Sequence, residues 1–347
     1  FHDVIRKESI KILSSLRRSA ARLLGARPEE IALVDNTTAG VNLAAAGMEW
    51  NRGDEVLVSD LEHPGGYLPW LVWRGRRDIR VNLLQTGNSD EDLLKNLATS
   101  LGPRTRAVSI SHVAWLTGRR LPVRKISRLC KKAGTLLIVD GAQSVGQIPV
   151  DVKKLGVDVY TISGQKWLMG PQGTGAVFVR QALRRKISEA AAGYRSARIK
   201  RLETLAFKPR ADAGRFEVST ISPALFSGLG VAIDICQKSG LRFIERRIAK
   251  LADQFLNTLR ECEGTVVLSP PGPAQSGLVS FRIKNLSAEE ALRILLKKDS
   301  IVLRAVDSNP PSLRASIHYL NSEREIERIG KAVAILANKR RSKRKRN

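Results

Sequence analysis

An apolar strand that ends in a carboxylate is predicted at Thr135-Leu136-Leu137-Ile138-Val139-Asp140, and a second, Val157-Asp158-Val159-Tyr160-Thr161-Ile162, leads into Ser163-Gly164-Gln165-Lys166. Short, continuous apolar strands are typical of a parallel sheet that is buried on both faces. Ligands of such open sheets bind at the carboxyl ends of the strands. We therefore expect Asp140 and Lys166 to lie together at a binding edge.

The alternation of strand and helix extends in both directions from this pair. Further strands are predicted at residues 31–34, 55–58, 80–83, 107–110 and 175–179, with helices at 5–24, 41–46, 90–100 and 123–133. This pattern predicts an α/β fold with a mainly parallel sheet. After about residue 224 helices prevail, with short strands at 278–283, 301–303 and 313–318. We expect a large domain over residues 1–224 and a smaller C-terminal α+β domain over 225–338.

The composition is that of a globular protein with an unusual charge. Of the 347 residues, 59 are lysine or arginine and 33 are aspartate or glutamate, which gives a formal net charge of +26. Such a charge points to nucleic acid, acidic membrane surfaces or anionic ligands, or to basic residues spread over a solvated surface. One local concentration follows the last apolar periodicity. We expect residues 339–347 to be a disordered basic tail with weak polyanion binding.

Cysteine and histidine usage excludes other classes. Cys130, Cys236 and Cys262 stand far apart without a CxxC pair, and the four histidines are scattered. We therefore expect no metal site, and a reducing compartment. No apolar run approaches the roughly 20 residues that span a bilayer, so we expect a cytoplasmic protein with no membrane contact.

A constellation of motifs at the predicted binding edge resembles a known family. The motifs are Val139-Asp140-Gly141-Ala142-Gln143-Ser144-Val145-Gly146, Ser163-Gly164-Gln165-Lys166-Trp167 and Gly170-Pro171-Gln172-Gly173-Thr174-Gly175. Together they resemble the class V aminotransferases, pyridoxal-phosphate enzymes that include cysteine desulfurases, C–S lyases and epimerases.

The resemblance covers residues 10 to 336 approximately and implies a fold, a cofactor and an assembly. The fold is aspartate aminotransferase-like, with a mainly parallel seven-stranded-type sheet covered by helices in the large domain. The cofactor is pyridoxal 5'-phosphate, the substrate is an L-amino acid, and the protein is a homodimer with active sites shared across the interface. We expect the segment that the family usually has before the helix at residue 5 to be missing.

The resemblance also gives cofactor roles to individual residues. Lys166 matches the lysine that forms the internal Schiff base, Asp140 the carboxylate that pairs with the pyridinium nitrogen, and Gln143 the partner of the phenolate oxygen. His63 matches the imidazole that stacks on the ring and shuttles protons. The phosphate ligands are matched by Thr38, Ser163 and Gln165, with Thr37 adjacent, and by Thr220, which in family dimers reaches across to the partner's phosphate.

Two basic residues and a tryptophan are matched to substrate binding. Arg314 matches the arginine that clamps the substrate carboxylate bidentately. Arg304 helps to orient the substrate or is a plain surface charge. Trp115 stands where desulfurases commonly have asparagine, which looks more like the C–S lyase branch.

One departure from the desulfurase pattern bears on the reaction. Desulfurases carry a nucleophilic cysteine on the loop that matches residues 305–312, and this loop contains none. We therefore expect β-elimination from cysteine, cystine or a related thioether. The alternatives are an aminotransferase or epimerase of another amino acid, and a desulfurase with a non-standard nucleophile. Outside enzymes, the alternative is nucleic-acid or other polyanion binding through the basic tail.

Overall fold

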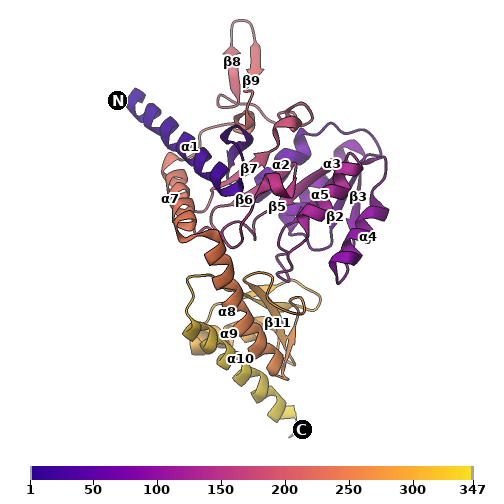
Figure 1. The fold of residues 1–347 in the computed structure, drawn as a ribbon, viewed down its shortest axis with the longest axis vertical. Coiled ribbons are helices and arrows are strands. Elements are labelled where there is room, and N and C mark those ends of the chain that lie inside the picture. Colours follow the sequence, from indigo (N-terminus) through magenta and orange to yellow (C-terminus); the bar gives the residue numbers. More distant parts are fainter. Residues whose placement is uncertain (1, 345–347) are drawn as a thin grey trace. The chain divides into compact units, whose positions relative to one another are not determined.

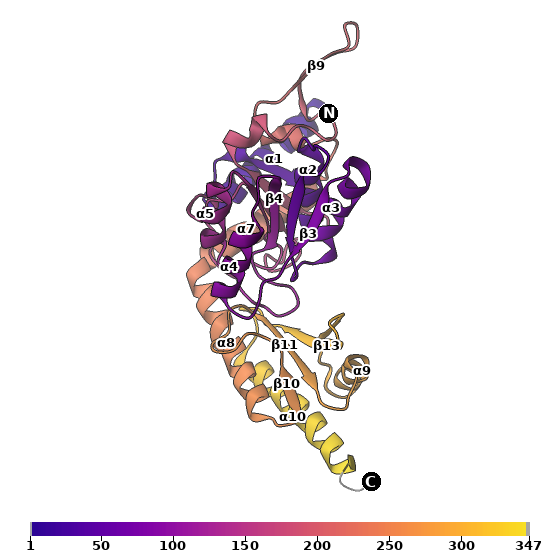
Figure 2. The ribbon, with the colours of Figure 1, turned by 90° about the vertical axis from the view of Figure 1, so that its right-hand side faces the viewer.

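The chain folds into two compact units, shown in Figures 1 and 2. The computed structural model describes residues 2–344, without side-chain detail for 2–5, 184–185 and 339–344. The large unit comprises residues 1–112 and 121–240, and the small unit comprises 113–120 and 241–347.

The boundary predicted at residue 224 is wrong by one helix. Helix α7 (Pro223–Ser239) belongs to the large unit, where it packs against α1 (His2–Leu24). Its buried face carries Phe226, Leu229 and Ile233. The helix break at Gly240 then starts the small unit. Sequence periodicity identifies the apolar face of a helix but does not identify its packing partner, which explains the error.

The large unit is built on a seven-stranded sheet in the order β1-β7-β6-β5-β4-β2-β3. The strands are β1 (Ile31–Val34), β2 (Glu55–Ser59), β3 (Arg80–Leu84), β4 (Thr105–Ser111), β5 (Leu136–Asp140), β6 (Val159–Ser163) and β7 (Gly175–Val179). Strands β3, β2, β4, β5 and β6 pair in parallel, whereas β7 is antiparallel to both β6 and β1. The predicted α/β fold with a mainly parallel sheet is confirmed.

Helices precede, connect and follow these strands. They are α1, α2 (Thr37–Gly47), α3 (Pro64–Arg77), α4 (Asp90–Ser100), α5 (Val123–Lys132), α6 (Val152–Leu155) and α7. Helix α3 was not predicted, because its first turn reads Pro64-Gly65-Gly66 and Pro69 follows inside the helix. A proline at the first helical position is nevertheless compatible with a helix start.

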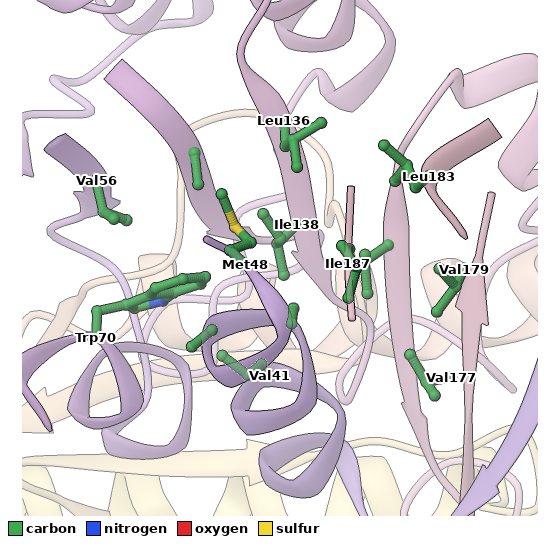
Figure 3. Close-up of a cluster of buried hydrophobic side chains, with 14 of the residues drawn as sticks. Val41, Met48, Val56, Trp70, Leu136, Ile138, Val177, Val179, Leu183 and Ile187 are labelled. Atoms are coloured by element: carbon green, nitrogen blue, oxygen red, sulfur yellow. The ribbon is translucent and has the colours of Figure 1, made fainter. Parts of the chain in front are cut away.

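One face of the sheet carries a continuous apolar core, part of which Figure 3 shows. Alternate residues of a strand point to the same face, so Val56 and Val58 of β2 and Leu136 and Ile138 of β5 enter this core together. Trp70 of α3 is fully buried in the core, and its indole nitrogen donates to the Gly66 carbonyl at 3.0 Å. Each such large side chain contributes about 1.5–3 kcal/mol through burial.

A two-stranded hairpin of the large unit was also not predicted. Strands β8 (Ala197–Arg201) and β9 (Ala206–Pro209) pair with each other and project from the rest of the unit (Figures 1 and 2). Leu202 and Leu205 at its turn are 84% and 83% exposed. The hairpin buries almost no apolar surface in this unit, and the alternation at Ala197 and Ile199 is too short to identify a strand.

The small unit is a four-stranded antiparallel sheet in the order β10-β11-β13-β12 with three helices. Its elements are α8 (Leu241–Glu261), β10 (Thr265–Val267), β11 (Leu278–Ile283), α9 (Ala288–Asp299), β12 (Arg304–Val306), β13 (Ser312–Ser316) and α10 (Glu323–Arg344). The rings of Phe255 and Phe281 meet edge to face in its core, with centroids 5.6 Å apart. The strand predicted at 301–303 is displaced to 304–306, because the ladder begins where Arg304 pairs with Arg314.

The prediction of an irregular basic tail is wrong for its first six residues. Helix α10 continues to Arg344, so residues 339–344 are its last turns. Lysine and arginine are good helix formers, and cations at a helix C-terminus interact favourably with the helix dipole. Residues 345–347, and the polyanion contacts predicted for the cluster's side chains, lie outside the described residues.

No described helix is long and apolar enough to cross a membrane. No group of three or more histidine, cysteine, aspartate or glutamate residues in the described part of the chain could hold a metal ion.

Candidate functional site

The carboxyl edge of the sheet brings Asp140, Lys166 and His63 together. Asp140 ends β5 and Lys166 follows β6, its parallel neighbour, in which Thr161 pairs with Asp140. Burial raises the pKa of the Asp140 carboxyl, while the charge of Lys166, the N–H of Ala142 and the charge of His63 lower it. The Ala142 N–H donates to Asp140 Oδ1 at 2.7 Å. The three predicted residues therefore act on one another electrostatically.

His63 is fixed at the start of α3. It is the N-cap residue, and its Nδ1 accepts a hydrogen bond from the Gly65 N–H at 3.1 Å. A Cβ on Gly65 would lie 2.3 Å from Thr38 Oγ1. Only glycine allows the first turn of α3 to approach Thr38 so closely, and this approach places His63 beside the start of α2.

The first turn of α2 is a candidate phosphate site. Asn36 caps the helix by accepting from the Ala39 N–H at 2.9 Å, and Thr37 and Thr38 follow, the first buried and the second exposed. Free N–H groups and the helix dipole favour an anion at such an end. A Cβ on Gly175, which pairs with Ser163 across β6 and β7, would lie 3.2 Å from the Asn36 Cα. The predicted phosphate ligands Thr37, Thr38 and Ser163 are thus close in space.

Gln143 is held by its neighbour in the second motif. Its Oε1 accepts from the Trp167 Nε1 at 2.9 Å. Among the described residues, no acceptor takes its amide N–H groups. This arrangement leaves a donor at the site, which fits a partner for the cofactor's phenolate oxygen. Gln165, one residue before Lys166, is exposed.

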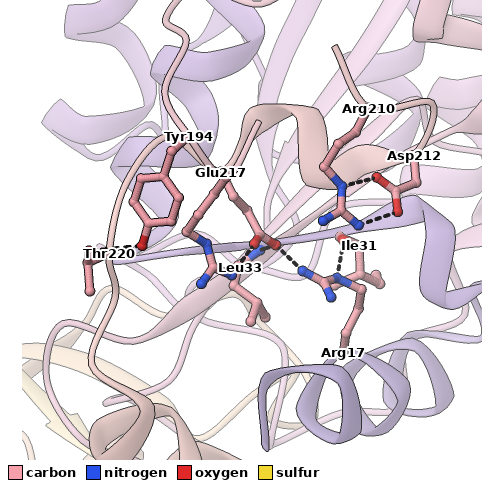
Figure 4. A network of polar contacts seen from close by, with 9 residues as sticks. Arg17, Ile31, Leu33, Tyr194, Arg210, Asp212, Glu217 and Thr220 are labelled. Carbon is pink, nitrogen blue, oxygen red and sulfur yellow. Dashed lines mark hydrogen bonds and ion pairs between the residues drawn. The ribbon is translucent and has the colours of Figure 1, made fainter. Parts of the chain in front are cut away.

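Thr220 lies beside α2 in the same unit. The Tyr194 and Thr220 hydroxyls are 2.9 Å apart (Figure 4). Thr220 lines a groove of about 370 Å³ with Ala39 and Asn42 of α2. The buried carboxylate of Glu217, three residues before Thr220, fixes this part of the chain. It accepts hydrogen bonds from Arg17, from Arg195 at 2.7 Å and from the Leu33 N–H at 3.0 Å. Thr220 is therefore presented at the surface.

In the small unit, Arg314 is a buried cation. It is 7% exposed, and its Nη1 donates to the Trp115 carbonyl at 2.6 Å. Its Nε is buried and has no hydrogen-bond partner, and no described carboxylate pairs with it. Burial and the charge of Arg304, its exposed ladder partner, lower the pKa of Arg314 to about 10. A guanidinium in this state is suited to bind a carboxylate.

The loop of Trp115 belongs to the same unit. Ser276 donates to the Gly118 carbonyl at 2.8 Å, and Ser280 donates to the Leu116 carbonyl. Together with the bond from Arg314, these contacts fix loop 113–120 on the small unit.

Sequence reasoning missed Glu62. This carboxyl is 9% exposed and follows β2 directly before His63. Burial, opposed by a hydrogen bond from Ser59, raises the pKa of Glu62 to about 7, and the charge of Asp140 adds to the rise. The only signal in the sequence was its position beside His63 at a strand end.

Comparison with known proteins shows the family of this chain. The sequence model of the aminotransferase class-V family matches residues 2–329. The chain belongs to this family. It is 28% identical to a probable cysteine desulfurase of Methanothermobacter thermautotrophicus over 94% of this chain and 84% of the relative. It is 30% identical to a cysteine desulfurase of Salmonella agona over 93% of this chain and 82% of the relative.

A solved structure is similar over nearly the whole chain. The complex of the cystine C–S lyase C-DES with its reaction product cysteine persulfide superposes with a TM-score of 0.90 at 29% identity, covering 96% of this chain and 89% of that chain. A lysine-to-alanine variant of C-DES, with glycine linked covalently to its pyridoxal-phosphate cofactor, gives the same TM-score. The family and these neighbours identify the chain as a pyridoxal-phosphate-dependent enzyme.

The donor set of the large unit fits this cofactor. Lys166 supplies an amine, Asp140 a buried carboxyl for the ring nitrogen, and Gln143 a donor for the phenolate oxygen. The open end of α2 supplies N–H groups for a phosphate. The predicted enzyme class and cofactor are confirmed, and the roles of the individual residues stay predictions.

Proposed function

We propose that this enzyme cleaves the C–S bond of cysteine- or cystine-type amino acids by β-elimination. The observation that carries the proposal is that the cofactor residues and a carboxylate-binding arginine are present, whereas no cysteine stands on the loop between β12 and β13. A desulfurase of the usual kind needs a reactive thiolate.

The three cysteines are packed as apolar side chains. Cys130 on α5 is fully buried, and burial raises the pKa of its thiol to about 12. Cys236 on α7 is 3% exposed, and burial raises the pKa of its thiol to about 11. Cys262 packs against the core of the small unit. Thiols held in this way are poor nucleophiles.

Different residues of the large unit would bind the cofactor and transfer the proton. The cofactor, when bound, supplies an electron sink for negative charge at the substrate Cα. Lys166 would hold the cofactor and take the Cα proton on its Nζ. Asp140 would keep the ring nitrogen protonated, and its burial strengthens that pairing. His63, fixed through Nδ1, would lie against the ring.

Elimination breaks the bond between Cβ and sulfur. From cysteine and water it yields sulfide, pyruvate and ammonia, and from cystine and water it yields cysteine persulfide, pyruvate and ammonia. The C-DES structure contains cysteine persulfide as the product of that lyase. Arg314 is the group in the small unit that would bind the substrate α-carboxylate, with Arg304 and Trp115 as its neighbours.

We also propose that the enzyme is a homodimer and that it works in the cytoplasm. Thr220 is presented at the surface of its own unit, which suits a contact to a partner's phosphate. The exposed Leu202 and Leu205 of the hairpin also suit burial in a second copy. The free cysteines suit a reducing compartment. Light scattering of the purified protein tests the dimer, and a monomer at micromolar concentration would contradict it.

A panel of amino acids tests the reaction. The purified enzyme with its cofactor is expected to form pyruvate and ammonia from cystine or cysteine without an added 2-oxo acid. A requirement for a 2-oxo acid would instead identify an aminotransferase. In Lys166→Ala, the near-visible absorbance of the lysine-bound cofactor and the pyruvate formation should both be lost, and an unchanged spectrum would overturn the role of Lys166.

A further inference from the structure

The buried carboxyl of Glu62 is held by three donors at the binding edge of the sheet. Ser59 Oγ and the Ser111 N–H donate to its Oε1 at 2.5 and 2.6 Å, and Ser111 Oγ donates to its Oε2 at 2.8 Å. Ser59 ends β2 and Ser111 ends β4, so Glu62 joins the carboxyl ends of two neighbouring strands.

The same contacts connect Glu62 to two predicted cofactor residues. Ser111 is the ladder partner of Asp140, and the next N–H, of His112, donates to the Asp140 carbonyl at 2.9 Å. On the other side, His63 follows Glu62 in the chain. A Cβ on Gly66 would lie 2.7 Å from Glu62 Oε2, so the first turn of α3 rests directly on this carboxyl. Glu62 thereby contacts Ser111, which pairs with Asp140, and the first turn of α3, which His63 caps.

Opposing interactions hold the pKa of Glu62 close to neutral pH. Burial and the neighbouring Asp140 of β5 oppose ionisation, whereas the bonds from Ser59 and Ser111 favour it, and the pKa of Glu62 stands at about 7. Asp140 in turn faces Lys166 after β6 and His63 at the start of α3. Two anions this close in a buried site repel each other, so a proton on Glu62 favours the anionic form of Asp140.

We propose that Glu62 is a positioning residue of the cofactor site, which fixes Asp140 and His63 relative to each other and takes up a proton so that Asp140 keeps its charge. The inference rests on the proposed function for the roles of Asp140 and His63. The titration of Glu62 itself does not depend on those roles.

The pH dependence of unfolding of the cofactor-free protein tests the titration. The unfolded chain loses the Glu62 proton near the ordinary pKa of 4.5, and the folded chain loses it near 7. Wild type must therefore lose stability relative to Glu62→Gln as the pH rises between these values. The difference in melting temperature between Glu62→Gln and wild type should grow by about 5–10 °C across this pH window, from 4.5 to 7. At higher pH the difference should stay constant. Parallel curves from pH 4 to 8 would overturn the proposal.

Two serines on β4 provide a matched pair of further variants. Ser111→Ala removes a donor to the Glu62 carboxylate and should move the upper end of the window to higher pH. Ser109→Ala is the control, because Ser109 is buried on the same strand but donates to the Gly66 carbonyl at 3.2 Å. It should leave the window unchanged, and an equal shift in both variants would show a general effect on β4 and overturn the assignment.

The lysine-bound cofactor gives a second readout in the loaded enzyme. Above about pH 7 wild type carries an anionic Glu62, which favours positive charge nearby. Glu62→Gln lacks this charge, so the variant should lower the pH midpoint of the near-visible band by about one unit. An unchanged midpoint would contradict the positioning role. If wild type shows no such band, the proposed function fails, whereas the unfolding experiment still decides whether Glu62 titrates.

Discussion

Replacing Arg314 with methionine should stabilise the protein and abolish efficient turnover. The buried guanidinium has no counter-ion among the described residues, and its pKa falls from 12.5 to about 10 through burial and repulsion by Arg304. A fall of that size corresponds to roughly 3 kcal/mol of unfavourable free energy for the folded cation. Loss of the hydrogen bond to the Trp115 carbonyl costs the variant about 1 kcal/mol of stability. Methionine keeps the apolar length of the side chain, so a net gain of about 2 kcal/mol is expected.

The effect on catalysis has the opposite sign. A bidentate pair between Arg314 and the substrate carboxylate consists of two charge-assisted hydrogen bonds, each worth about 1.5–3 kcal/mol. Their loss should lower kcat/KM by a factor of about 10²–10⁴. Arg314→Lys is the matched variant, because it keeps the charge but not the fork geometry. It should lose about tenfold or more in kcat/KM and gain no stability.

Denaturant unfolding without cofactor and steady-state kinetics with cofactor measure the two effects separately. An Arg314→Met protein that is less stable than wild type would refute the reasoning, because it would show that the folded protein pairs the cation. A kcat/KM within threefold of wild type would refute the substrate role independently.

The remaining predictions concern the large unit. Glu217→Gln leaves the guanidinium groups of Arg17 and Arg195, whose side chains are 13% and 20% exposed, without their buried anion. Calorimetry should show a loss of about 3 kcal/mol in the free energy of unfolding. The control Asp78→Asn removes an exposed pair with Arg52 at 2.8 Å and should cost less than about 1 kcal/mol. Equal losses in the two variants would contradict this account of the network. Asp140→Asn should lower kcat by about 100-fold or more, measured at equal cofactor content by absorbance, and an undiminished kcat would exclude a role for its charge.

The central sheet was predictable because most of its strands are buried on both faces, the edge strand β3 excepted. Continuous apolar runs such as 136–140 and 159–163 have few alternatives to a parallel core strand. The elements that were missed lack this constraint. Helix α3 begins with Pro64-Gly65-Gly66, and those glycines are required by close contacts with Thr38 and Glu62, which no local pattern reveals.

The candidate site was predictable where its residues stand in motifs at neighbouring strand ends. Asp140, Gln143 and Lys166 lie on two consecutive strand ends, which the parallel register brings together. Glu62 could not be found in this way, because its partner Ser111 is 49 residues away in the chain. The state of Arg314 was equally hidden, since a sequence does not show that a cation is buried without an anion.

The most direct test of the account is the product formed from cystine or cysteine by wild type and by a variant with alanine at Cys130, Cys236 and Cys262. Cys130 and Cys236 are buried and Cys262 is partly buried against the core of the small unit, so we expect pyruvate as the main product of both proteins, with kcat unchanged within about twofold. Alanine as the main product of wild type, with its formation lost in the cysteine-free variant, would contradict elimination and identify a thiol-dependent desulfurase.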